Sequence, residues 1–253
     1  MTSRIAMWSG PRNISTAMMR SWENRPDCEV VDEPFYAYFL DQTKHAHPMF
    51  DDVIASQAIS YDKVAKDMSG GPCDGSFNSS FNEPLQYQKH MTQHMLAGCD
   101  LSWTKGLQHC MLIRDPAFVV NSYTNSRGEC SAEDIGIQRQ FELYEAISKL
   151  TGQDIPVVDS VSVLNDPQRI IPAMCEALGV ECGNETLNAM LNWPTGKRDS
   201  DGVWASHWYH SVEKSTGFGT SKATELNLNA SQKAVVDEVM PFYEKMKAKA
   251  LRA

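Results

Sequence analysis

Short apolar runs bounded by turn residues alternate along the chain with longer segments whose apolar residues recur at helical spacing. The short runs predict strands at residues 5–8, 28–32, 63–68, 109–113 and 155–158. The longer segments predict helices from residue 15 or 16 onward and at 35–40, 82–97, 117–123, 131–150, 167–179 and 232–251. Strands that alternate with helices predict an α/β three-layer sandwich with a central parallel sheet. Residues 69–82, rich in Gly, Ser and Asn, predict a long loop of the kind that often serves a binding site.

Length and composition narrow the class of protein. The 253 residues contain no linker, low-complexity tract or internal repeat, which predicts a single domain over 1–253. The net charge of −9 argues against nucleic acid as a partner and against a polyanionic acceptor. No signal-peptide core and no long apolar run occur, and the seven cysteines lack metal-ligand spacing. These features predict a cytoplasmic protein with reduced thiols, no membrane partner and no metal, whereas the oligomeric state has no sequence signal.

Ligands of parallel α/β sheets bind beyond the carboxyl ends of the strands, so the residues after each predicted strand are the candidates for chemistry. After the first strand come Ser9-Gly10-Pro11-Arg12, with Ser15 or Thr16 as the predicted helix cap. The free N–H groups of that helix, its dipole and the Arg12 guanidinium together predict a P-loop-like phosphate-binding turn. The alternative is an ordinary helix start in which Arg12 is only a surface charge.

A second anion signal follows a later strand. Arg114 comes directly after residues 109–113, and Ser122 lies eight residues further on, so that a guanidinium and a hydroxyl can hold one phosphate. The alternative is that Arg114 pairs with Asp115 or caps the neighbouring strand ends. Two strand ends that each carry an arginine favour a ligand with two phosphate groups. ATP with Mg²⁺ is disfavoured, because Ile14 and Ser15 stand where a Walker A motif has Gly and Lys.

The two segments also resemble known motifs. SGPRNISTAMMRSW resembles the 5′-phosphosulfate loop of sulfotransferases that use 3′-phosphoadenosine 5′-phosphosulfate (PAPS), with Arg12 where many members have Lys. LIRDPAFVVNSY resembles their 3′-phosphate motif, and GKRDSDGVWASHW resembles their basic closing loop, although it does not follow the R-K-G pattern closely. VVDEPFYAYFL and KVAKDM suggest a bacterial-type branch. The resemblance implies that PAPS is bound by Gly10, Pro11, Arg12, Asn13, Ile14, Ser15, Thr16, Arg114, Ser122 and Lys197 or Arg198.

The resemblance further implies the reaction: in-line transfer of a sulfuryl group from PAPS to a hydroxyl or amine of a small or medium acceptor, without a metal. Arg12 is then expected to stabilise the leaving oxygen. Glu33, at the end of the second strand, is the first candidate for the general base, although it can instead form a salt bridge with Arg12. His94, Asp67 and Lys66 are alternative bases. The acceptor site is expected among residues 35–40, 69–82 and 204–210.

Two other functions remain open at this point. One is a P-loop-type kinase of a small metabolite, and the other is a non-catalytic nucleotide-binding protein of the same fold. His90 and His94, four residues apart on the helix predicted at 82–97, are interpreted as surface or core histidines and not as metal ligands, because no Glu follows His90.

Overall fold

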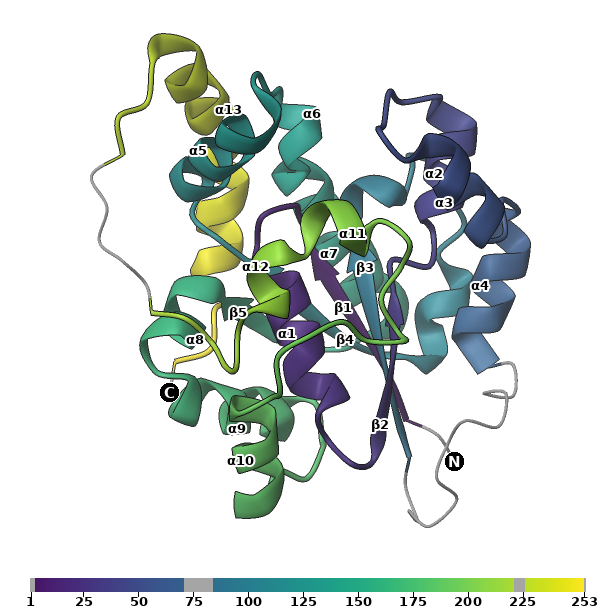
Figure 1. The fold of residues 1–253 in the computed structure, drawn as a ribbon, viewed down its shortest axis with the longest axis vertical. Coiled ribbons are helices and arrows are strands. Elements are labelled where there is room, and N and C mark those ends of the chain that lie inside the picture. The colour runs from purple at the N-terminus through teal and green to yellow at the C-terminus, as the bar shows by residue number, and fades with distance from the viewer. Residues whose placement is uncertain (1–2, 71–83, 221–225, 253) are drawn as a thin grey trace.

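The protein is built around a parallel sheet with helices on both faces (Figure 1). The computed structural model describes residues 3–70, 84–220 and 226–252. The sheet has the order β2-β3-β1-β4-β5, and every neighbouring pair is parallel. This confirms the predicted α/β fold with a central parallel sheet. The strands are β1 (Ser3–Ser9), β2 (Cys28–Asp32), β3 (Leu85–Met91), β4 (Gln108–Ile113) and β5 (Val157–Asp159).

Helices fill the segments between the strands. The first half of the chain contains α1 (Ser15–Glu23), α2 (Tyr36–Thr43), α3 (Phe50–Ser56), α4 (Tyr61–Gly70) and the short 3₁₀ helices η1 (Thr92–His94) and η2 (Ser102–Gly106). The second half contains α5 (Pro116–Arg127), α6 (Ala132–Ile135), α7 (Ile137–Thr151), α8 (Ser160–Asn165), α9 (Pro167–Ala177), α10 (Asn184–Leu191), α11 (Ala205–Trp208), α12 (His210–Glu213) and α13 (Ala230–Lys247). No helix within the described ranges has the length and apolar character needed to cross a bilayer.

Alternation along β1 sends its side chains into two separate cores. Ile5 and Met7 pack on one face with residues of α1, α2 and α9, whereas Ala6 and Trp8 pack on the other with residues of α4, α7 and α13. All four side chains are fully buried. Burial of a side chain of this size stabilises the fold by about 1.5–3 kcal/mol. The two cores hold the central strand rigidly, and its carboxyl end at Ser9 is therefore a fixed platform.

Two predicted elements are wrong. Residues 63–68 form part of α4 and not a strand, because Val64, Ala65 and Met68 lie on one buried helix face. Residues 82–97 contain β3 and η1 in place of a helix, and residues 82–83 of that segment lie outside the described residues. β3 lies between β1 and β2, where ladder hydrogen bonds on both sides outweigh the local helix signals.

The boundaries of the other predicted elements agree with the structure to within a few residues, except that one predicted helix is divided in two. Ser131 and Asp134 form a capping box at the start of α6. Gly136, which has a φ of 68°, separates α6 from α7, so the single helix predicted over 131–150 is two helices. Of the loop predicted at 69–82, residues 69–70 belong to α4 and the rest lies outside the described residues.

The register of the sheet brings distant residues to one edge. Ser9 of β1 lies opposite both Met91 and Leu112, and Asp32 of β2 lies opposite Lys89 of β3. The turn after β1, Glu33 and the residues after β3 and β4 consequently meet at the carboxyl ends of the strands.

Candidate functional site

The turn between β1 and α1 has an unusual backbone. Arg12 and Ile14 have φ values of 59° and 53°, in the left-handed region that non-glycine residues rarely adopt. Asn13 between them donates its side-chain N–H to the carbonyl of Leu112 at 2.5 Å, which anchors the turn to β4. A Cβ on Gly10 would lie 2.7 Å from the carbonyl oxygen of Ile135, so only glycine fits there.

The start of α1 carries no side-chain cap. Ile14 occupies the cap position, and Ser15 and Thr16 are the first two residues of the helix. The predicted capping role of Ser15 or Thr16 is therefore wrong. Because no side chain takes the first N–H groups of α1, these groups and the positive end of the helix dipole are left for an anion.

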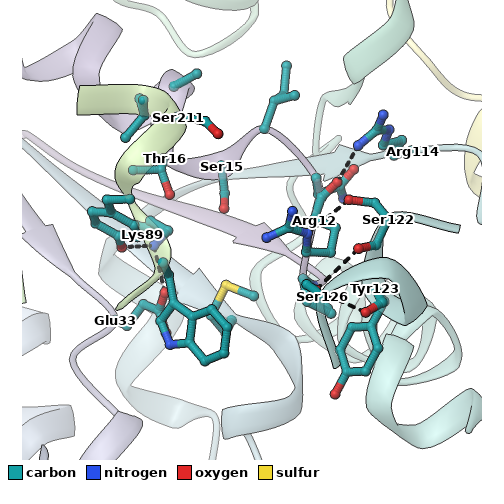
Figure 2. Close-up of a pocket in the computed structure, with 18 of the residues that line it drawn as sticks. Arg12, Ser15, Thr16, Glu33, Lys89, Arg114, Ser122, Tyr123, Ser126 and Ser211 are labelled. Atoms are coloured by element: carbon teal, nitrogen blue, oxygen red, sulfur yellow. Dashed lines mark hydrogen bonds and ion pairs between the residues drawn. The ribbon is translucent and has the colours of Figure 1, made fainter. Parts of the chain in front are cut away.

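The two anion sites expected from the sequence form one continuous site (Figure 2). Arg12 donates its Nε–H to the hydroxyl oxygen of Ser122 at 2.9 Å, and Arg114 donates from Nη1 to the carbonyl oxygen of Arg12 at 2.6 Å. Asp115 caps α5 through the backbone N–H of Ala117, so the alternative pairing of Arg114 with Asp115 does not occur as an ion pair.

The cations of this site repel one another. Burial, followed by repulsion from Arg127, lowers the pKa of Arg12, and burial, followed by repulsion from Arg12, lowers the pKa of Arg114. No ion pair among the described residues involves Arg12, Arg114 or Arg127. A bound anion would relieve this repulsion, so the charge pattern suits a phosphate or sulfate ester.

A cavity of about 470 Å³ opens at this edge of the sheet. In the view of Figure 2, Glu33 and Lys89 lie on one side of it, Arg12, Arg114 and Ser122 lie on the other, and Ser15 and Thr16 lie between them. The expected site residues that line it are Pro11, Arg12, Asn13, Ile14, Ser15, Thr16, Glu33, His94, Arg114 and Ser122. Gly10 lies just before these residues in the turn.

The structure does not bring Lys197 and Arg198 to this cavity. Arg198 instead forms an ion pair with Glu23 at the end of α1, at 3.7 Å, and donates to the carbonyl oxygen of Pro194 at 2.5 Å. The nearby segment that does line the cavity comes from α11, α12 and the residues after them, including Trp208, Tyr209 and Gly219.

Glu33 is held by a buried network on the opposite side. Its own φ is 44°, and its backbone N–H donates to the carbonyl oxygen of Lys89 at 3.0 Å. The Lys89 ammonium donates to Glu33 Oε1 at 2.6 Å, to Asp32 Oδ1 at 2.8 Å and to the Tyr209 hydroxyl at 2.6 Å. Tyr209 in turn donates to Asp32 Oδ2 at 2.7 Å. The expected alternative of a salt bridge between Glu33 and Arg12 is therefore wrong, because Lys89 is the partner.

Burial governs the protonation of this network. It raises the pKa of Glu33, and the neighbouring Lys89 charge opposes that rise. For Lys89, burial alone lowers the pKa, but the carboxylates of Asp32 and Glu33 outweigh it and raise the pKa well above its usual range. Lys89 is thus a fixed cation. Glu33 is a carboxylate whose affinity for a proton is increased, which suits a general base.

The alternative bases are placed very differently. His94 Nε2 lies 3.9 Å from Glu33 Oε2, and the imidazole stacks on Tyr36 and Phe39 with ring centroids at 4.4 and 5.0 Å. Burial, followed by the charge of Lys89, lowers the pKa of His94 well below its usual value, so the ring is neutral. Lys66 and Asp67 lie on α4 and do not line the cavity, and Asp67 pairs with Lys63 at 2.8 Å.

His90 is a core residue, as expected, but it does not share a helix face with His94. It lies on β3, stacks on Trp8 with ring centroids 4.5 Å apart, and lies 3.0 Å from Gln88 Oε1 through Nε2. Within the ranges that the structure describes, no group of three or more His, Cys, Asp or Glu side chains is arranged to hold a metal ion.

Comparison with known proteins places the chain in a family. The model of the sulfotransferase domain matches residues 3–250. The chain belongs to this sulfotransferase domain family. Two proteins of Arabidopsis thaliana, branched-chain-amino-acid aminotransferase-like proteins 1 and 2, are 30% and 27% identical to it over 239 residues. That match covers 94% of this chain but 40% of each plant protein, so the chain spans less than half the length of these relatives.

A solved structure supports the same fold. A sulfotransferase domain from the curacin biosynthetic pathway has a TM-score of 0.52 and 16% sequence identity, and the match covers 95% of this chain and 98% of that domain. A sulfotransferase from Alicyclobacillus acidocaldarius has a TM-score of 0.48 at 10% identity, over 98% and 97% of the two chains.

Among the lining residues to which sequence reasoning gave no role are Lys89, Tyr209 and Arg127. Lys89 was not recognised because a helix was predicted over 82–97. A strand prediction there would have placed Lys89 beside the end of the strand that precedes Glu33. For Arg127 the sequence contains one weak indication of a role at the site. It follows Ser122 by five residues on the helix that begins at the second anion motif. Tyr209 was inside the expected acceptor region of 204–210 but was not assigned a role.

Proposed function

We propose that this protein is a PAPS-dependent sulfotransferase that acts on the hydroxyl or amine of a small acceptor. The observation that carries the proposal is the pairing of Arg12 with Ser122 and of Arg114 with the Arg12 carbonyl. Among the described residues, no carboxylate forms an ion pair with either arginine, and their pKa values are lowered by burial and by mutual repulsion of the cations. Membership of the sulfotransferase domain family supports the same reaction class.

The residues present fit a donor with two separate anionic groups. The uncapped start of α1, with Ser15 and Thr16, would hold the 5′-phosphosulfate end together with Arg12. Arg114 and Ser122 would hold the 3′-phosphate. ATP with Mg²⁺ fits less well, because the turn has no lysine at the Walker A position, and this disfavours the alternative of a small-metabolite kinase.

When bound, the donor supplies the sulfuryl group, whose bond to the 5′-phosphate oxygen breaks as the acceptor oxygen or nitrogen bonds to sulfur. Arg12 and the first N–H groups of α1 stabilise negative charge at the phosphate end of the site. Glu33 takes the proton of the acceptor, since its carboxylate lines the cavity and burial raises its pKa. Lys89 keeps that carboxylate in place.

The first test is binding of adenosine 3′,5′-bisphosphate in the presence of EDTA, measured by calorimetry and by thermal shift. We expect the bisphosphate to stabilise the protein and ATP with Mg²⁺ to have little effect. Stabilisation by ATP with Mg²⁺ alone would contradict the proposal. A protein that binds the bisphosphate but never turns over PAPS with any acceptor would instead be the non-catalytic nucleotide-binding alternative.

Variants locate the two anionic groups. Arg114→Ala is expected to weaken bisphosphate binding by about 10- to 100-fold, since a hydrogen bond to a charged group contributes about 1.5–3 kcal/mol. Arg12→Ala is expected to weaken binding of PAPS and to lower its rate of turnover. Arg198→Ala is the matched control, because Arg198 pairs with Glu23 away from the cavity. Equal losses in Arg198→Ala and Arg114→Ala would refute this placement of the donor.

A further inference from the structure

A second cavity, of about 630 Å³, adjoins the first. The two share Pro11, Tyr36, Gln93, His94, Tyr123 and Arg127 along a common wall. Its size falls within the range of small-molecule sites. Glu33, which lines only the first cavity, lies at this boundary next to His94. A molecule in the second cavity that extends past His94 would come within reach of the general base.

Arg127 is the cation of the shared wall. Its guanidinium lies over the Trp208 ring at 4.3 Å and over the Tyr123 ring at 5.3 Å, and the side chain is exposed. No ion pair of the described residues involves it. Stacking on two aromatic rings restricts the guanidinium, so that less entropy is lost when it forms a bidentate pair with a planar anion. The guanidinium of Arg127 is therefore held in an orientation that suits pairing with a carboxylate.

The inner wall of this cavity is aromatic. Tyr36 and Phe39 both stack on His94, and the three rings form an aromatic part of the cavity wall. His94 is 3% exposed, and its Nδ1 is buried without a hydrogen-bond partner among the described residues. A buried polar atom of this kind costs free energy unless a ligand or water satisfies it. This unsatisfied atom is a second sign, independent of Arg127, that a ligand belongs here.

Tyr36 adds a hydrogen-bond donor to the same wall. His47 Nδ1 accepts the backbone N–H of Met49 at 3.1 Å, and burial lowers the pKa of His47 to about 4, so its proton is on Nε2. That Nε2–H then donates to the Tyr36 oxygen at 2.5 Å. The Tyr36 hydroxyl hydrogen is consequently left to donate to a ligand.

The same cavity also carries carboxylates, from Glu133, Asp134, Glu142 and Glu238. Asp134 is engaged in the cap of α6, and Glu142 pairs with Arg139, the other arginine of this cavity, at 3.1 Å. Carboxylates at this position repel a second or third negative group on the ligand. The charges of the cavity therefore favour a single anionic group, placed at Arg127.

From this arrangement we propose that the second cavity binds a small monocarboxylic hydroxy acid with one aromatic ring. Its carboxylate pairs with Arg127, its ring packs on Tyr36 and Phe39, and its hydroxyl faces Glu33. The proposal rests on the sulfotransferase function proposed above, because it names the class of acceptor for that reaction.

The test measures binding and does not depend on turnover. The protein is first saturated with adenosine 3′,5′-bisphosphate, and a panel of aromatic hydroxy acids that includes mandelate and 4-hydroxyphenylacetate is titrated by calorimetry, each acid beside its methyl ester. We expect at least one acid to bind about tenfold more tightly than its ester, as one charge-assisted pair predicts. Arg127→Gln should remove this difference, and because Arg127 also borders the first cavity, it should weaken bisphosphate binding less than it weakens the acid and less than Arg114→Ala weakens the bisphosphate.

Lys249→Gln is the matched control. It removes one positive charge from an exposed side chain that lines neither cavity, so it should keep the preference for the acid. Three results would overturn the proposal: no acid binds better than its ester, Lys249→Gln loses the preference equally, or Arg127→Gln weakens the bisphosphate as strongly as the acid. The last result would make Arg127 a donor-binding residue. Failure of the proposed function would be recognised separately, as absence of bisphosphate binding by the unmodified protein.

Discussion

Substitution of Lys89 by methionine tests whether the buried network is as important as its geometry indicates. The Lys89 side chain is 1% exposed and donates three hydrogen bonds, to Asp32, Glu33 and Tyr209. Methionine has a similar length, so it leaves no large cavity but removes the cation. Asp32 and Glu33, whose side chains are 1% and 11% exposed, would then be left as neighbouring buried carboxylates without a cation, and Asp32 would keep its hydrogen bonds from Tyr209 and Gly202.

The expected loss is large, because removal of one partner from a buried ion pair destabilises a protein by about 3–5 kcal/mol. We expect the free energy of unfolding, measured by urea titration with tryptophan fluorescence, to fall by about this amount in Lys89→Met. Lys63→Met is the matched control, since Lys63 pairs with Asp67 on α4 with both side chains more than half exposed. There the loss should be about 0.5 kcal/mol or less.

A second variant separates charge from packing. Asp32→Asn combined with Lys89→Met removes one of the two orphaned carboxylates and should recover part of the lost stability. If the free energy of unfolding of Lys89→Met lay within about 1 kcal/mol of that of the original protein, the argument that Lys89 is a required buried cation would be refuted. A double variant no more stable than Lys89→Met would show that the loss comes from packing and not from unpaired charge.

Three other predictions concern Glu33 and the first turn. Glu33→Gln should keep the affinity for adenosine 3′,5′-bisphosphate in calorimetry and lower PAPS turnover by about 100-fold or more, and unchanged turnover would remove Glu33 as the base. The base acts as a carboxylate, and burial raises its pKa above the usual 4.5. We therefore expect kcat to fall as the pH is lowered through that raised pKa. A kcat that stays constant down to pH 4.5 would contradict the assignment. Gly10→Ala places a Cβ 2.7 Å from the Ile135 carbonyl oxygen and should lower the free energy of unfolding, measured by urea titration, by about 1–3 kcal/mol. Gly106→Ala, whose Cβ would have no atom within 4 Å, should lower it by less.

The parts of the fold that the sequence predicts correctly are those whose local signals agree with their surroundings. The strand at residues 5–8 is apolar on both faces and is buried on both faces, and the carboxyl-end rule then places Arg12 and Arg114 at one edge. Their direct connection through the Arg12 carbonyl was not predictable, because it depends on a left-handed φ at Arg12.

β3 shows where sequence reasoning fails and why. Its Gln, Lys and His side chains suggest a surface helix, yet residues 85–91 are all buried. Each polar side chain has a partner that only the fold supplies: Gln88 donates to the Met68 carbonyl, Lys89 to Asp32, and His90 stacks on Trp8. The buried Gln and Lys groups of this strand are satisfied by contacts that lie far away in the sequence, and periodicity along the chain does not record such contacts.

Backbone conformation supports the location of the site without reference to any family. The described residues contain four non-glycine positions with positive φ, and three of them, Arg12, Ile14 and Glu33, line the first cavity. Each such residue costs about 1–2 kcal/mol relative to an ordinary conformation. At Arg12 the left-handed backbone accompanies the bond from Arg114 to its carbonyl, and at Glu33 it accompanies the backbone bond to Lys89. Strain of this kind persists where surrounding contacts hold it, and it is typical of functional sites. The conformations that destabilise the fold locally are therefore the same ones that bring the cations and the base together around one cavity.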